Sequence, residues 1–130
     1  MGVCSDGILY FGFQVGNDDE RPEWMGEFED FDDFLVHKAG FDPDDVDYKK
    51  LTKIVNSCPA ELQTYCSYEY SMYVLGVRGA EYRAARGDLI EIGQDDLKVP
   101  QEKIEAFKAW CKEIGIKWEK PKWLLCSMYG

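Results

Sequence analysis

Short apolar runs alternate along the chain with amphipathic runs, and the two patterns predict strands and helices respectively. The first apolar run, residues 7–15 (GILYFGFQV), is rich in β-prone side chains and has the length of a strand. Gly12 interrupts it and indicates either a β-bulge or a point where another backbone comes close. The first predicted element is therefore a strand.

The next run has the spacing of a helix. Four apolar side chains recur on one helical face: Trp24, Phe28, Phe31 and Leu35. Phe34 widens this face, and Gly40 is a suitable stop. The helix starts either near Trp24 or at Asp30, which could cap a shorter helix. The stripe either packs on a sheet or forms, in part, an exposed aromatic and acidic docking face.

A second helix is predicted to end at Val55, with either Asp45 or Asp47 as its cap. Its predicted inward face consists of Tyr48, Leu51, Ile54 and Val55. Pro59 disfavours helix in the residue before it and so closes this segment.

Strand-like alternation of side chains follows over residues 61–77 and is clearest over residues 72–77. Gly79 predicts a hairpin-type turn, after which residues 82–85 would continue as a paired strand. Residues 89–92 form a further short apolar run. This region therefore contributes two or three predicted strands.

The clearest helix is predicted over residues 101–114, with Pro100 at its start and Gly115 at its end. Residues 123–129 (WLLCSMY) predict a last strand. Helices grouped beside a mostly antiparallel or mixed sheet of three to five strands indicate an α+β fold with two or three helices. Because there is no repeat, linker or low-complexity tract, we interpret residues 1–130 as one domain.

Composition agrees with one folded domain. A chain of 130 residues with 45% hydrophobic and 15% aromatic side chains can form a core, which argues against disorder. No apolar run approaches the roughly 18 residues of a membrane span, and the N-terminal residues lack the pattern of a secretory signal. The expected protein is soluble, intracellular and cytoplasmic, with no membrane partner.

One segment carries the whole net charge of −10. Residues 17–47 hold 13 acidic and two basic residues, a net charge of −11, and the rest of the chain is almost neutral. Because like charges repel, the aromatic side chains between the acidic ones must favour the folding of this acidic helical segment.

The leading hypothesis is a non-enzymatic binding protein that docks this segment on a basic surface of another protein. Complementary charge speeds the encounter, and buried aromatic side chains then hold the complex. The candidate partner-binding residues are Asp18, Asp19, Glu20, Glu23, Trp24, Glu27, Glu29, Asp32 and Asp33. In this hypothesis the carboxylates imitate phosphates, so the protein would inhibit a nucleic-acid-binding partner.

No motif for metal, cofactor or catalytic chemistry is complete. The five cysteines include no Cys-x-x-Cys pair, which favours free thiols over zinc ligands. His37 is the only histidine and belongs to a predicted helix end, so nothing pairs it with a Cys or Ser nucleophile. A calcium loop counted from Asp42 fails, because Asp47 and Lys53 occupy the positions of its Gly and Glu. We therefore expect a capped turn there, predict no cofactor or metal, and disfavour an enzyme.

Several basic and aromatic side chains could contact an anion: Arg78, Tyr82, Arg83 and Arg86. Surface arginines that neutralise neighbouring acids are the simpler interpretation, and a net charge of −10 argues against nucleic-acid binding. The second functional hypothesis is a small enzyme or ligand-binding domain that uses the Tyr- and Cys-rich sheet with Arg83 and Arg86. The third is a structural or assembly homo-oligomer that buries Trp118 and Trp123.

Three blocks of the sequence carry a resemblance. They are residues 2–13 (GVCSDGILYFGF), residues 66–77 (CSYEYSMYVLGV) and residues 85–88 (ARGD). Together they resemble small uncharacterised proteins of tailed bacteriophages and prophages. The resemblance implies a phage-encoded protein in the host cytoplasm, where inhibition of a host protein would serve anti-defence. It assigns no activity and no functional residue.

Overall fold

The computed structural model describes residues 5–16, 21–28, 30–67 and 71–129. Within these ranges the strands are β1 (Ser5–Val15), β2 (Ala60–Ser67), β3 (Ser71–Ala84) and β4 (Lys122–Tyr129). The α-helices are α1 (Phe31–Lys38), α2 (Tyr48–Ser57) and α3 (Gln101–Ile114), and the short 3-10 helices are η1 (Glu23–Met25), η2 (Pro43–Asp45) and η3 (Asp95–Leu97). The α+β fold predicted from the sequence is confirmed.

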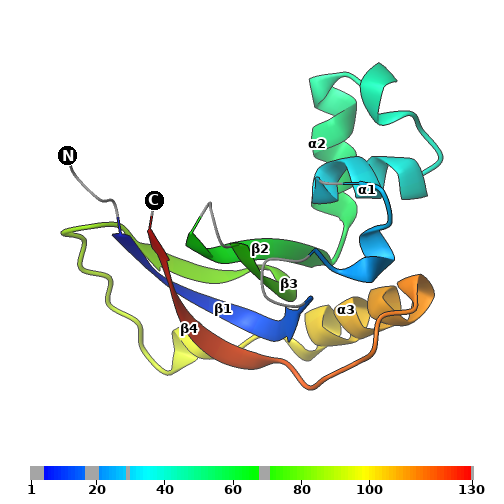
Figure 1. Cartoon of the computed structure of the whole chain (residues 1–130). Coiled ribbons are helices and arrows are strands. Elements are labelled where there is room, and N and C mark those ends of the chain that lie inside the picture. The colour runs from blue at the N-terminus through cyan, green and yellow to red at the C-terminus, as the bar shows by residue number, and fades with distance from the viewer. Residues whose placement is uncertain (1–4, 17–20, 29, 68–70, 130) are drawn as a thin grey trace, which may run out of the picture.

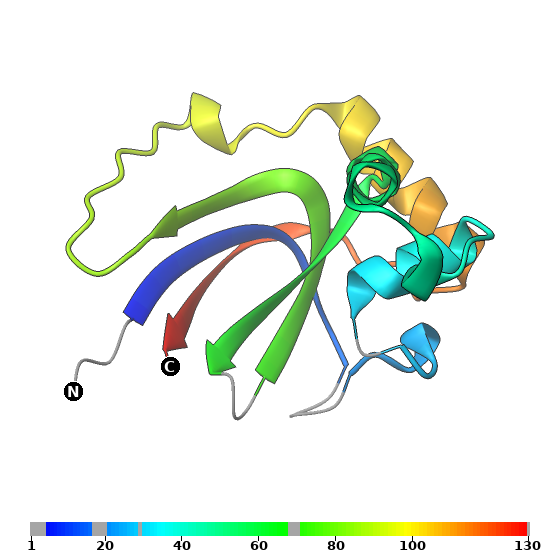
Figure 2. The ribbon, with the colours of Figure 1, turned by 90° about the horizontal axis from the view of Figure 1, so that it is seen from above.

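The four strands form a mixed sheet that closes on itself. β1 pairs antiparallel with both β3 and β4, and β2 pairs antiparallel with β3. β4 then meets β2 in parallel, through Cys66 opposite Met128 and Ser67 opposite Tyr129. The sheet is strongly curved, and all three helices lie toward one end of it (Figure 1, Figure 2).

β1 and β3 come close together at two facing glycines, Gly12 and Gly76. A Cβ atom on Gly12 would lie 2.2 Å from the carbonyl oxygen of Leu75, and one on Gly76 would lie 2.5 Å from that of Phe11. Only a residue without a side chain allows such distances. Because the strand register also shifts here, the predicted bulge or close approach at Gly12 is confirmed.

The predicted hairpin at Gly79 is wrong. β3 runs without a break from Ser71 to Ala84, and its residues 77–80 lie opposite the single β1 residue Phe11. Gly79 has a φ of 82°, which lets this bulge form without reversing the chain. The last residues of β3 therefore pair with β1, and residues 89–92 lie outside the strands with their side chains exposed.

Capping side chains decide where the first two helices begin. The Asp30 carboxylate accepts a hydrogen bond from the backbone N–H of Asp32 at 2.8 Å, so α1 takes the shorter of the two predicted forms. Asp47 accepts from the backbone N–H of Lys50 at 2.8 Å and so caps α2. α3 occupies the predicted residues and ends at Gly115, which has a φ of 91°.

Alternate side chains of the strands supply two separate apolar clusters. The smaller cluster lies within the closed sheet and consists of Ile8, Tyr10, Val74 and Met128. The larger one joins the other face of the sheet to the helices, and its buried members include Phe13, Phe31, Phe34, Leu35, Leu75, Phe107 and Cys111. Phe31 and Phe34 are therefore core, but their ring contacts are to Trp24 and to Trp110 of α3 rather than directly to a strand, so the stripe packs mainly on a helix.

Residues 85–100 connect β3 to α3 and follow the outside of the curved sheet (Figure 2). The hydroxyl of Tyr82 donates to the carbonyl oxygen of Asp96 at 2.6 Å. The indole N–H of Trp123 donates to the carbonyl oxygen of Leu97 at 2.8 Å. Two strand side chains thus hold this long connection against the sheet.

Candidate functional site

The acidic segment folds as a lobe of short helices. We define the acidic lobe as residues 21–28 and 30–47, which include η1, α1 and η2. Desolvation, and after it the charge of Asp30, raises the pKa of Asp32. Desolvation, and then the charges of Asp30 and Asp44, raises the pKa of Asp33. α1 and η2 are in contact, so the acidic start of α1 lies near the aspartates of the η2 turn although the two lie apart in the sequence.

Three aspartates of the lobe shape its turns. Besides Asp30 and Asp47, Asp42 accepts a hydrogen bond from the backbone N–H of Asp44 at 3.0 Å, so the predicted capped turn is confirmed. The other exposed carboxylates make no ion pair with any residue that the structure describes: Glu23, Glu27, Asp33, Asp44 and Asp45. The capped turns at Asp30 and Asp42 thus hold the backbone that carries exposed Asp33, Asp44 and Asp45.

The candidate partner-binding residues have different surroundings. Glu23, Glu27 and Asp33 are exposed, whereas Asp32 is half-buried. Trp24 is also half-buried. The remaining candidates, Asp18, Asp19, Glu20 and Glu29, lie outside the described residues.

Trp24 joins the lobe to the core. Its ring centroid lies 5.3 Å from that of Phe34 and 6.1 Å from that of Trp110 on α3, both in edge-on geometry. Aromatic pairs in this geometry are stabilising. These two ring contacts therefore give Trp24 a role in holding α1 against α3.

Two aromatic side chains of the lobe region are exposed instead. Phe41 is 41% exposed and Tyr48 is 83% exposed, and they lie on either side of the aspartate-rich turn at η2. The prediction that Tyr48 faces inward is wrong, because it occupies the first turn of α2, directly after the Asp47 cap. Lys50 lies over the Phe41 ring, with its Nζ 3.5 Å from the ring centroid.

The three candidate anion-binding arginines do not share a site. Arg78 donates to the carbonyl oxygens of Cys58 at 2.8 Å and Ala60 at 3.0 Å. Arg83 contacts Asp6 and the Tyr10 hydroxyl, each at 3.2 Å. Arg86 is exposed and has no hydrogen bond or ion pair with the described part of the chain. Arg78 and Arg83 therefore stabilise the fold through contacts of their own.

The cysteines are free thiols wherever the structure describes them. Cys58 and Cys111 are buried, and Cys66 and Cys126 are half-buried. Burial raises the pKa of the Cys111 thiol to about 12, which keeps it protonated and a poor nucleophile. Among the described residues, no three His, Cys, Asp or Glu side chains are placed to hold a metal ion.

Glu81 of β3 pairs with Tyr10 of β1, and one oxygen of its carboxylate, Oε2, is buried without a hydrogen bond from the residues described. Burial, and after it the charge of Glu61, raises the pKa of Glu81. A group with a raised carboxyl pKa destabilises the fold above that pKa, and the penalty disappears as the pH falls through it.

We expect Glu81→Gln to raise the free energy of unfolding at pH 7 by less than about 1 kcal/mol, since it removes a charge that burial disfavours and that the positive charge of Arg83 only partly offsets. The gain should shrink as the pH is lowered, because the native carboxyl group then becomes neutral as well. Urea denaturation at several pH values measures both effects. Glu91→Gln, at an exposed position, is the control and should change little. An equal gain for both variants would contradict the prediction.

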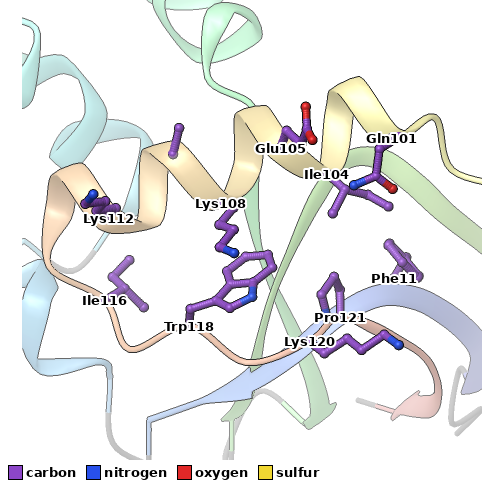
Figure 3. A pocket seen from close by; sticks show the side chains of 11 residues that line it. Phe11, Gln101, Ile104, Glu105, Lys108, Lys112, Ile116, Trp118, Lys120 and Pro121 are labelled. Carbon is purple, nitrogen blue, oxygen red and sulfur yellow. The ribbon is translucent and has the colours of Figure 1, made fainter.

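A groove between α3 and the segment that follows it was missed by the sequence analysis. Its volume is about 670 Å³, and we name it the lysine–tryptophan groove after Lys108, Lys112, Lys120 and Trp118, which line it (Figure 3). Lys108 and Lys112 lie one helical turn apart on α3, which is a signal that the sequence does contain. Lys120 and Trp118 come close to these two lysines only when the chain folds.

Comparisons with protein-family models, with curated proteins and with solved structures found no match. The resemblance to phage proteins therefore stays a prediction. Over the ranges that the structure describes, no helix has both the length and the apolar character needed to cross a bilayer. Trp118 and Trp123 are half-buried, and each packs against another aromatic ring, Phe107 and Phe11 respectively.

Proposed function

We propose that the protein is a non-enzymatic binding protein that docks its acidic lobe on a basic surface of another protein. The observation that supports this most directly is the pair of exposed aromatic side chains, Phe41 and Tyr48, on either side of exposed Asp44 and Asp45. Tyrosine is common among the residues that dominate binding energy. Carboxylates around such an anchor speed encounter with a cationic partner and orient it.

A basic protein is a better partner than a nucleic acid. Phosphates would be repelled by a segment whose net charge is −11 over residues 17–47. The same charges favour lysine and arginine side chains on a partner. Under the phage resemblance, that partner would be a nucleic-acid-binding host protein involved in defence, and the carboxylates would take the place of phosphates.

Capture from a host lysate tests this proposal with three forms of the full chain. The first is the native protein, and the second carries Asp33→Asn, Asp44→Asn and Asp45→Asn, which leave the three capping aspartates intact. The third carries Glu91→Gln, Glu102→Gln and Glu119→Gln, which change the net charge equally at exposed positions outside the lobe.

We expect the native and the third form to recover the same basic partner, and the second form to recover at least about tenfold less. Tyr48→Ser should also weaken capture. Raised salt should reduce the contribution of Tyr48 to binding less than it reduces the contribution of the carboxylates, because salt screens charges. Equal recovery by the second and third forms would reject the lobe as the docking face. Binding that is insensitive to both salt and Tyr48→Ser would reject the mechanism.

A further inference from the structure

We propose that the lysine–tryptophan groove binds a small amphipathic anion, a molecule with an apolar aromatic or alkyl body and one carboxylate-like head group. The groove lies between α3 and residues 116–121, and its lining shares no residue with the acidic lobe. The proposal is therefore independent of the proposed docking function.

The floor of the groove is apolar and firmly supported. Trp118 packs against Phe13 and Phe107, with ring centroids 5.8 Å and 5.4 Å away. Both phenylalanines are buried in the larger cluster, so the indole ring is held by the core. Ile104 and Phe11 extend the same apolar surface (Figure 3). A flat or elongated apolar group can therefore lie against a preformed surface.

The walls of the groove are cationic. The Nζ atom of Lys108 lies 5.7 Å from the centroid of the Trp118 ring. Lys112 lies further along α3, and Lys120 belongs to the opposite wall (Figure 3). None of the three makes an ion pair with the residues described here, and Glu105 is the acidic residue among those that line the groove.

This concentration of positive charge is unexpected in a chain with a net charge of −10. An anion that enters the groove would gain charge-assisted hydrogen bonds from these ammonium groups, with Glu105 of the lining as a competing carboxylate. The indole N–H of Trp118 has no acceptor among the described residues, and Figure 3 shows it turned toward Pro121, along the groove. The groove therefore combines an apolar floor with several donors for one negative group.

Size favours a small ligand over an acidic peptide. A volume of about 670 Å³ lies in the range of sites for small molecules. The aromatic part of the floor consists of Trp118 and Phe11, which suffices for one ring system or one alkyl chain. Lys108 and Lys112 stand on α3 and Lys120 on the opposite wall, so an anionic head group can meet an ammonium group from either side of this surface.

Titration of the folded full chain with 8-anilinonaphthalene-1-sulfonate tests the site, since this probe has an aromatic body and one sulfonate. We expect saturable fluorescence enhancement, which dodecanoate reverses and the neutral dodecanol does not. Lys108→Gln combined with Lys120→Gln should weaken probe binding by about tenfold, because two charge-assisted contacts are lost. Lys49→Gln combined with Lys53→Gln makes the same charge change at exposed positions of α2 and should leave binding within about twofold.

Several outcomes would overturn the proposal. They are absence of probe binding by the native protein, equal weakening by the two lysine pairs, and equal displacement by dodecanoate and dodecanol. If a peptide of alternating Glu and Phe bound more tightly than the probe through the same lysines, the ligand of the groove would be a peptide, and the small-ligand proposal would be wrong. Circular dichroism of each variant separates loss of the site from loss of the fold, and capture by the acidic lobe should be unaffected by the Lys108 and Lys120 substitutions.

Discussion

Gly12→Ala should lower the free energy of unfolding by about 3 kcal/mol, the upper part of the range for overpacked positions. The added Cβ atom would lie 2.2 Å from the carbonyl oxygen of Leu75 and 2.6 Å from the Cα atom of Gly76. Both are backbone atoms of β3, so no side chain can turn aside to make room. β1 and β3 must therefore separate where Gly12 and Gly76 face each other. Gly76→Ala should have a similar effect, because it brings a Cβ atom to 2.5 Å from the carbonyl oxygen of Phe11.

Chemical denaturation of the two variants measures this loss. Gly7→Ala is a matched control in the same strand, since a Cβ atom there meets no heavy atom within 4 Å. We expect the control to stay within about 0.5 kcal/mol of the native protein, as surface substitutions usually do. If Gly12→Ala were as stable as Gly7→Ala, the close approach of β1 and β3 would be incorrect.

Arg78→Gln is expected to cost about 2 to 3 kcal/mol. The guanidinium group donates to the carbonyl oxygens of Cys58 and Ala60. The backbone N–H of Arg78 donates to the carbonyl oxygen of Pro59 at 3.1 Å. This residue thus fixes the corner between α2 and β2 to the bulge of β3. Arg78→Lys should recover little, because an ammonium group cannot reproduce the forked geometry that serves two acceptors.

Arg86→Gln is the matched control for Arg78→Gln, since Arg86 is exposed in a turn after β3. Thermal and urea denaturation should place the control within about 0.5 kcal/mol of the native protein. Full stability of Arg78→Lys would show that positive charge alone is needed, through Glu61 at 3.9 Å, and would contradict the structural role argued from the two carbonyl contacts.

Local features of the fold were predictable, and features that depend on distant partners were not. Gly115 marked a helix end correctly, and Asp30 was one of the two starts considered for α1, because caps act on adjacent backbone groups. The hairpin predicted at Gly79 was wrong because a glycine with a left-handed φ fits a β-bulge as well as a hairpin turn. The role of Arg78 depends on carbonyl groups 18 and 20 residues earlier, which become neighbours only after β2 and β3 pair.

The same distinction applies to the candidate sites. The concentration of acids could be read directly from the sequence, but periodicity did not show which aromatic side chains remain exposed. Phe34 fits the helical stripe and is buried, whereas Phe41 follows the helix stop and is exposed. The lysine–tryptophan groove combines α3 with residues from β1 and the connection to β4, so no local pattern could predict it.

The pairing of β1 with both β3 and β4 has a consequence for synthesis on the ribosome. β1 can join β3 soon after Ala84 leaves the exit tunnel, but its other edge waits for Lys122–Tyr129. Throughout that interval the nascent chain carries an open strand edge, which is a template for association with other chains. Translation speed over the codons for α3 and β4 should therefore influence how much of the protein aggregates before it is released.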